Sequence, residues 1–268
     1  MKENNALKPK SKVRKIFEII FVIFSSIISV ASIAISCTII FHNTYYELFW
    51  VNGQSMYPTL NYNAVDKNGN KIGILDTFGP IGNSNVDYGY MDVVPSVKEN
   101  LQRFDIVVIE RNPDSEIDII KRILVLPNEQ FYFVSTGRGN EHNGDLYVKK
   151  VGSEEFELIP QDFYDTSHPE AEGIVIDGEY NEGNPRFYST STEAPENPYQ
   201  LADDEYFVAG DNRHPKCSSD DRQRQTGTFR NEIKGKAIGL EGTCSVAQGT
   251  NGKKYRAVDV KRYWPTRF

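Results

Sequence analysis

Residues 51–60 read Val-Asn-Gly-Gln-Ser-Met-Tyr-Pro-Thr-Leu and place Ser55 in a tight, glycine-preceded segment shortly after a long apolar run. Further along the chain, Lys121 lies in the middle of the apolar stretch Ile117–Leu126. A serine hydroxyl is a weak nucleophile and needs a base within hydrogen-bond reach. A lysine can be that base only when its amine is neutral, and burial among apolar groups lowers the pKa of an amine. Ser55 and Lys121 together therefore predict a peptide-bond hydrolase whose general base is an amine.

Each of these two residues has a simpler interpretation when it is taken alone. Lysines on strands usually point to solvent, and serines in turns usually serve only the turn. The interpretation therefore depends on the rest of the chain.

The composition indicates a chain with a sizeable core and an uneven charge distribution. With 268 residues, 39% of them hydrophobic, the chain can bury one large or two small domains beside a membrane segment. Its 20 glycines and 13 prolines favour β-structure with many turns. The net charge is −7, and residues 1–15 hold six basic side chains and one acidic one, which leaves −12 on the remainder. An acidic main part with a basic tail argues against a nucleic-acid partner.

The run Ile19–Phe41 is long enough to cross a membrane. Its 23 residues carry no formal charge, and as a helix they would span about 34 Å, against about 30 Å for a hydrocarbon core. Basic residues precede it, so the positive-inside rule places the N-terminus in the cytoplasm and the rest of the chain outside. We expect a basic tail over 1–15 and a permanent transmembrane helix over 16–41. The alternatives are a cleaved secretory signal and a lipoprotein cleavage site at Cys37, but the apolar run is longer than either normally has.

Downstream of this anchor, the sequence indicates short strands separated by turns. Apolar runs bounded by turn residues predict strands at Phe104–Glu110, Ile117–Leu126, Glu205–Ala209 and Ile233–Leu240, the last followed by a Gly/Asn-rich loop. Residues 61–100 are rich in Asn, Gly and Asp, which predicts a hairpin plus a surface insertion. Several short strands within 130–204 predict an inserted β subdomain. We therefore expect a mainly β fold whose core comes from residues 42–129 and 205–268.

Four segments form an ordered set behind the single anchor. They are Val51–Leu60, Phe104–Ile109, Lys121–Glu129, and Gly210–Arg213 followed by Ser218–Arg222. In that order they resemble the nucleophile box, the Arg-Gly-Asp-Ile-Val-Val strand, the Lys-Arg-Val-Ile-Gly-Leu-Pro-Gly-Asp box and the Gly-Asp-Asn-Arg…Ser-x-Asp-Ser-Arg box of bacterial type I signal peptidases. Three glycines of those boxes are replaced here, by Phe104, Val125 and Asn128. Asparagine tolerates a positive φ whereas valine does not, so the sequence does not determine the backbone path of the strand near Lys121.

The resemblance implies a role for each matching residue. Ser55 would be the nucleophile and Lys121 the general base. The Ser55 backbone N–H would form the oxyanion hole. Some members have a second donor, a side-chain hydroxyl, at the position of Gly53, whereas many Gram-positive members have glycine there, as this chain does. Ser218 would orient the lysine, and two extra residues after Arg213 leave Ser219 as a second candidate. The resemblance further implies an ion pair of Asp220 with Arg222, a structural start of the last box at Asp211, Asn212 and Arg213, and a pocket wall at Met56.

The same resemblance implies a fold, a location and a substrate. The fold would be an antiparallel β-sheet catalytic core of the signal-peptidase type, anchored once and lying on the extracytoplasmic side of the cell membrane. The substrates would be secreted preproteins with small residues before the cleavage site, whose extended segment adds to strands beside Ser55 and Lys121. The lipid bilayer and the secretion translocon would be further partners.

Other families and classes fit the chain less well. Self-cleaving SOS repressors share the Ser-Lys chemistry but act in the cytoplasm, and eukaryotic-type signal peptidases have histidine where this chain has Lys121. A triad based on His214 would need that loop to face Ser55. A catalytically inactive, membrane-anchored β domain that binds secreted partners is the alternative from a different class. No cofactor or metal is expected, because no Cys/His cluster has ligand spacing. A disulfide between Cys217 and Cys244 is left open.

Overall fold

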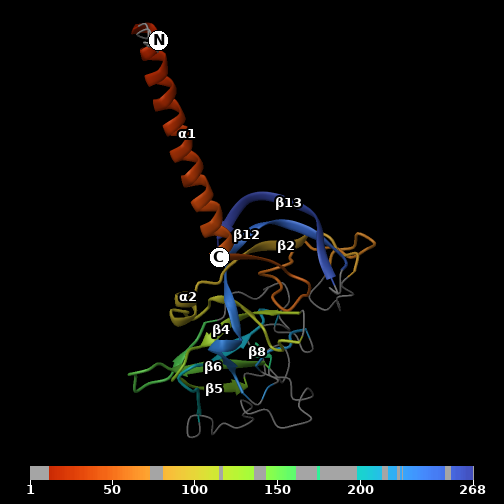
Figure 1. Ribbon diagram of the computed structural model, residues 1–268. Helices are drawn as coiled ribbons and strands as arrows, with labels where there is room; N and C mark the ends of the chain where they lie inside the picture. The colour runs from red at the N-terminus through yellow and green to blue at the C-terminus, as the bar shows by residue number, and fades with distance from the viewer. Residues whose placement is uncertain are drawn as a thin grey trace, which may run out of the picture. The chain divides into compact units, whose positions relative to one another are not determined.

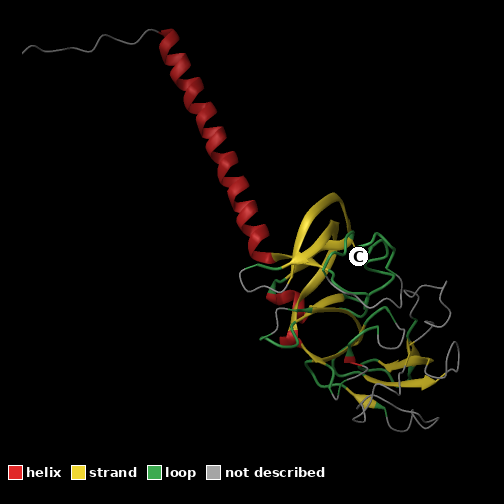
Figure 2. Ribbon diagram, turned by 90° about the vertical axis from the view of Figure 1, so that its right-hand side faces the viewer, coloured by secondary structure: helices red, strands yellow, loops and turns green. Residues whose placement is uncertain are grey.

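The computed structural model describes residues 12–72, 81–114, 117–135, 143–160, 174–175, 198–212, 217–221, 224, 226–250 and 255–267 (Figures 1 and 2). The chain divides into two compact units, Met1–Tyr45 and Tyr46–Phe268.

In the first unit the structure describes one long helix, α1 (Lys12–Tyr45). Its mean hydropathy reaches 2.5 and none of its residues is buried, so by length and composition it can cross a membrane. Several of its hydroxyls donate to main-chain carbonyls one turn earlier, as Ser26 does to the Val22 carbonyl at 2.8 Å, which satisfies these polar groups within the helix. The predicted apolar helix is present, and it extends beyond the expected residues 16–41 at both ends.

The second unit is built on an antiparallel sheet of eight strands, which confirms the mainly β fold (Figure 2). In spatial order the strands are β1 (Tyr46–Trp50), β2 (Val86–Asp92), β12 (Ile233–Gln248), β3 (Ile106–Ile109), β4 (Ile119–Val125), β10 (Glu205–Ala209) and β11 (Thr228–Phe229), while β13 (Tyr255–Arg267) also pairs with β12. A short helix, α2 (Pro95–Glu99), precedes β3, and a 3-10 turn, η5 (Arg230–Glu232), precedes β12.

The expectation for residues 61–100 was wrong in one respect, because this stretch contributes β2 to the interior of the main sheet. Strand β2 pairs with β1 on one side and with β12 on the other. At Gly89 a Cβ would lie 2.2 Å from the carbonyl oxygen of Gly239 on β12, so the two backbones approach too closely for any side chain there. The turn residues that dominate the composition end before Val86, and they masked a seven-residue strand.

Strand β12 is also longer than its apolar pattern predicted. The expected strand ended at Leu240, whereas β12 continues to Gln248 and pairs with β13 along its second half. Register shifts interrupt this pairing between Leu240 and Gly242 and between Thr243 and Ser245. Because such irregularities break the period-two alternation, the sequence pattern did not reveal the extension.

A second, smaller sheet lies entirely within residues 130–204, the stretch predicted as an insertion. Its strands are β5 (Gln130–Ser135), β6 (Asn143–Lys149), β7 (Glu157–Leu158), β8 (Ile174–Val175) and β9 (Tyr199–Gln200). Phe131 of β5 packs on Phe207 of β10, with ring centroids 5.1 Å apart. Both belong to one buried cluster with Leu124 of β4. The second sheet therefore shares its core with the main sheet, and its standing as a separate subdomain stays a prediction.

A further buried cluster lies beneath the segment that carries Ser55. Met56 and Leu60 are fully buried and pack with Phe49 of β1, Met91 of β2 and Val108 of β3. Apolar burial of this extent stabilises the turn by several kcal/mol, at about 1.5–3 kcal/mol for each large side chain. The core thus fixes two apolar positions within the segment that carries Ser55.

Candidate active site

Ser55 and Lys121 meet in the structure although they come from separate elements. Ser55 lies in the turn after β1, and Lys121 lies in the middle of β4. The Lys121 Nζ donates to the Ser55 Oγ at 2.8 Å and to the carbonyl oxygen of Ile120 at 2.7 Å. Lys121 is 2% exposed, so its amine is buried while Ser55 is half-buried. The arrangement places a hydroxyl beside an amine at the distance that proton transfer requires.

The turn that carries Ser55 is held from below by a buried asparagine that the sequence did not single out. Asn61 donates through its Nδ2 to the carbonyls of Val51 at 3.0 Å and Gly53 at 2.8 Å. Its Oδ1 accepts from the backbone N–H of Asp87 on β2 at 2.8 Å. Asn61 has φ +64, a conformation that asparagine adopts more readily than most residues. No local sequence signal could have identified Asp87 as its partner.

The segment Gly210–Asn212 holds the same turn from the other side. The Asn212 backbone N–H donates to the Ser55 carbonyl at 3.0 Å, and its Nδ2 donates to the Gln54 carbonyl at 3.1 Å. A Cβ on Gly210 would lie 2.2 Å from the Ser55 carbonyl oxygen and 2.3 Å from the Ser218 Oγ. Only glycine therefore fits at position 210, and this steric limit explains why the box has glycine there.

Ser218, rather than Ser219, lies at the site. Ser218 is buried and donates through its Oγ to Asp220 Oδ2 at 2.6 Å, whereas Ser219 is exposed. The same carboxylate oxygen accepts from the Gly210 backbone N–H at 2.9 Å. Asp220 therefore ties Ser218 to the segment that closes on Ser55. This burial favours Ser218 for the lysine-orienting role, which stays a prediction.

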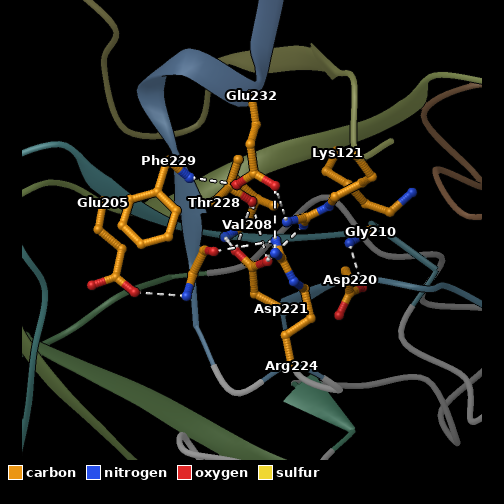
Figure 3. A network of polar contacts seen from close by, with 12 residues as sticks. Lys121, Glu205, Val208, Gly210, Asp220, Asp221, Arg224, Thr228, Phe229 and Glu232 are labelled. Carbon is orange, nitrogen blue, oxygen red and sulfur yellow. Dashed lines mark hydrogen bonds and ion pairs between the residues drawn. The ribbon is translucent and has the colours of Figure 1, made fainter. Parts of the chain in front are cut away.

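The neighbouring carboxylate, Asp221, forms a second buried polar network (Figure 3). It forms an ion pair with Arg111 Nη2 at 2.6 Å and accepts hydrogen bonds from the Val208 backbone N–H at 2.8 Å and the Thr228 hydroxyl at 3.0 Å. Burial raises the pKa of Asp221 from 3.8 to about 7, and the guanidinium of Arg111 acts in the opposite direction. The predicted partner of Asp220, Arg222, lies outside the described residues, as do Arg213 and His214.

An ion pair joins the lysine strand to the Gly210–Asn212 segment. Arg122, next to Lys121, donates through Nε to Asp211 Oδ1 at 2.8 Å and through Nη2 to Oδ2 at 2.5 Å. Thr59, from the nucleophile turn, donates to the same Oδ2 at 2.5 Å. A bidentate ion pair of this kind needs the planar guanidinium group of arginine, which a lysine amine could not replace. It connects all three chain segments that surround Ser55.

The three glycine replacements leave β4 continuous through Val125, although its pairing with β10 shifts register between Phe207 and Val208. Val125 continues the strand and pairs with Phe207. The left-handed positions are Asn128, with φ +63, and Phe104, with φ +74. Asn128 thus keeps the turn as expected, and the doubt about Val125 is removed. A positive φ at Phe104 was not expected, because a bulky residue rarely adopts it.

The remaining predicted residues have clear positions but no assigned role. Met56 is fully buried, so its part in a substrate pocket stays a prediction. At Gly53 a Cβ would have no neighbour within 4 Å. Cys217 and Cys244 do not form a disulfide with each other, and burial raises the pKa of Cys244 to about 11. In the described part of the chain, no group of three His, Cys, Asp or Glu side chains is placed to hold a metal ion.

Comparison with known proteins identifies the family. The family model for signal peptidase, peptidase S26, matches residues 21–239, a range that begins inside α1 and includes Ser55, Lys121 and Gly210–Asn212. A comparison with curated proteins gave no match. Because the family model spans most of its length, the chain belongs to the signal peptidase family, peptidase S26.

Proposed function

We propose that this protein is a membrane-anchored serine endopeptidase that removes N-terminal signal peptides from secreted preproteins with a Ser55/Lys121 dyad. The observation that carries the proposal is the 2.8 Å contact between the Ser55 Oγ and a lysine amine that is 2% exposed. Burial away from water disfavours the charged form of an amine, so it favours the neutral amine that a general base needs.

The dyad supplies both proton transfers of peptide hydrolysis. The neutral Lys121 amine takes the Ser55 hydroxyl proton while the Oγ attacks the scissile carbonyl carbon. The negative oxygen of the tetrahedral intermediate accepts from the Ser55 backbone N–H. The Lys121 ammonium then gives its proton to the leaving amine, and the acyl-enzyme ester remains. Lys121 next removes a proton from water, whose oxygen attacks the ester carbonyl carbon. The Ser55 Oγ then leaves and takes this proton back from Lys121, so the signal peptide departs with a free carboxyl group and the dyad is restored.

The support residues fit this scheme. The Ile120 carbonyl accepts from the Lys121 Nζ and so fixes the direction of the amine. Ser218, held by Asp220, would orient the same amine, and Arg222 would complete the ion pair with Asp220. Gly53 leaves the second oxyanion position without a side-chain donor, so that the Ser55 N–H would carry the main contact.

The unpaired edge of β4 is where the substrate would bind. Ile123 exchanges hydrogen bonds with Phe104 and Asp105 on the β3 side, at 2.8 and 2.9 Å. Because peptide groups alternate in an antiparallel strand, those of Ile120 point to the opposite edge. On that edge β10 pairs only as far as Arg122, and no strand of the described chain pairs beyond it. An extended preprotein segment can add there beside Lys121, with Ala-like side chains in small pockets.

The anchor gives the proposal its location. Basic residues precede α1, so the N-terminus would be cytoplasmic and the site extracytoplasmic. In that position the enzyme meets the C-terminal end of a signal peptide as it leaves the secretion translocon. The lipid bilayer and the translocon are therefore its proposed partners, in addition to the preproteins.

The test uses the full chain in detergent and several preproteins with an Ala-x-Ala site. We expect cleavage by the wild type, at least about 10³-fold loss for Ser55→Ala and Lys121→Ala, and wild-type rates for the exposed control variants Ser96→Ala and Lys67→Ala. Acid pH should lower the rate, because the amine becomes charged. Cleavage that persists in both dyad variants would exclude the dyad. Failure of the wild type on every preprotein would instead favour a membrane-anchored binding domain.

A further inference from the structure

Asn212 contacts both carbonyl groups that flank the candidate nucleophile. It is fully buried, and it lies 158 residues from Gln54 in the sequence. Its side-chain Nδ2 donates to the Gln54 carbonyl at 3.1 Å, and its backbone N–H donates to the Ser55 carbonyl at 3.0 Å. One residue thus holds the peptide groups on either side of the Ser55 Cα.

The first of these contacts falls on the peptide group that matters for catalysis. The Gln54 carbonyl and the Ser55 N–H belong to one planar peptide unit, in which they point in opposite directions. A hydrogen bond to this carbonyl therefore fixes the direction of the Ser55 N–H. The Tyr57 backbone N–H also donates to the Gln54 carbonyl, at 2.9 Å. The Ser55 N–H itself has no hydrogen-bond partner among the described residues, so it is available to a substrate oxygen.

The chemical nature of the Asn212 side chain suits this task. A donor on the carbonyl oxygen polarises the amide and strengthens its N–H as a donor. A neutral amide does so without placing a charge beside Ser55. An aspartate at the same position would lose the donor and set an anionic oxygen against the Gln54 carbonyl. The contact therefore influences both the direction and the strength of the Ser55 N–H.

We propose that Asn212 is a positioning residue for the oxyanion hole, which it serves by holding the Gln54–Ser55 peptide in place. This inference rests on the proposed function, in which Ser55 attacks a peptide carbonyl. It goes beyond a structural role because the effect of Asn212 is exerted when negative charge develops on the substrate oxygen. Loss of Asn212 should therefore weaken binding of the transition state more than binding of the substrate.

Asn61 provides a matched control within the same turn. It is also a buried asparagine, 1% exposed, whose Nδ2 donates to two carbonyls. Those carbonyls belong to Val51 and Gly53, so neither lies in the Gln54–Ser55 peptide. Replacing Asn61 by glycine removes these contacts and tolerates the local φ of +64. This variant should lose stability without a selective effect on the oxyanion.

The experiment compares two inhibitors on the full chain in detergent. A peptide aldehyde ending in alanine adds to the Ser55 Oγ and forms a hemiacetal whose oxygen occupies the oxyanion position. A reduced-amide peptide has CH2 in place of the carbonyl and makes no such contact. For Asn212→Asp and Asn212→Ala we expect kcat and aldehyde affinity to fall about 10–100-fold, less than the 10²–10³ for outright loss of an oxyanion donor. Reduced-amide affinity and KM should stay within about twofold.

The outcomes separate the inference from the function on which it rests. Equal weakening of both inhibitors, or a similar selective loss in Asn61→Gly, would reduce Asn212 to a structural residue. Unchanged kcat in folded Asn212 variants, with the fold checked by urea unfolding, would also overturn the inference while cleavage by the wild type stands. A wild type that cleaves no preprotein would overturn both.

Discussion

The ion pair between Arg122 and Asp211 offers the sharpest test of how the site is held together. The Arg122 side chain is 11% exposed and Asp211 is fully covered, at N–O distances of 2.8 and 2.5 Å. Arg122→Met keeps the apolar stem and leaves the Asp211 carboxylate buried without a cation. Removing one partner of such a pair costs about 3–5 kcal/mol. Total stabilities are only about 5–15 kcal/mol, so at least about a fifth of the stability is at risk.

The assay is urea unfolding of the full chain in detergent, followed by tryptophan fluorescence. We expect Arg122→Met and Asp211→Leu each to lose about 3–5 kcal/mol, and the double variant to lose clearly less than their sum, because neither charge is then left alone. The matched control is the exposed pair Lys150–Glu157, which has the same kind of contact at 2.6 Å with side chains about half exposed. Lys150→Met should cost less than about 1 kcal/mol. The reasoning fails if the buried single variants also cost less than about 1 kcal/mol, or if their effects are additive.

Three further predictions concern single positions. Gly210→Ala should lower kcat at least about 100-fold in steady-state cleavage, because its Cβ would meet the Ser55 carbonyl oxygen at 2.2 Å and displace the nucleophile turn; near-normal kcat would contradict this. Gly53→Ser should raise kcat up to about tenfold by adding a second oxyanion donor, because the site around Gly53 is open; a fall in kcat would show that the hydroxyl points elsewhere. Asp221 has a pKa of about 7 in the folded chain, above its ordinary 3.8, so the native state keeps a proton that the unfolded chain has lost. Stability should therefore fall as pH rises from about 4 to 7 and then level off, and Asp221→Asn should remove this slope in urea titrations.

The parts of the fold that were predictable are those with a short, regular apolar pattern. Strands β3, β4 and β10 follow runs bounded by turn residues, and the structure places them where the sequence indicated. Ser55 and Lys121 were identifiable because their motifs keep order along the chain. Their contact at 2.8 Å agrees with the chemistry expected from a serine beside an amine.

The parts that were not predictable depend on partners distant in sequence. Asp221 pairs with Arg111, which lies 110 residues away, in addition to the nearby Arg224, and Asn61 bonds to β2. Buried polar side chains need partners, but the sequence does not say which ones. The full length of β12 was also not predictable, because its register shifts break the period-two alternation on which a strand prediction relies.

Phe104 shows why replaced glycines need not change the site. Its φ of +74 costs about 1–3 kcal/mol for a bulky residue, and such a conformation persists only when its surroundings determine it. Here the Phe104 N–H donates to the Ile123 carbonyl at 2.8 Å, and the Phe104 carbonyl accepts from Arg122 Nη1 at 2.9 Å. Both contacts come from β4: one from Arg122, which also binds Asp211, and one from Ile123, the next residue. The strand that carries Lys121 therefore imposes the glycine-like backbone on Phe104. For that reason the loss of glycine at position 104 leaves Lys121 opposite Val107 in β3 and within reach of Ser55.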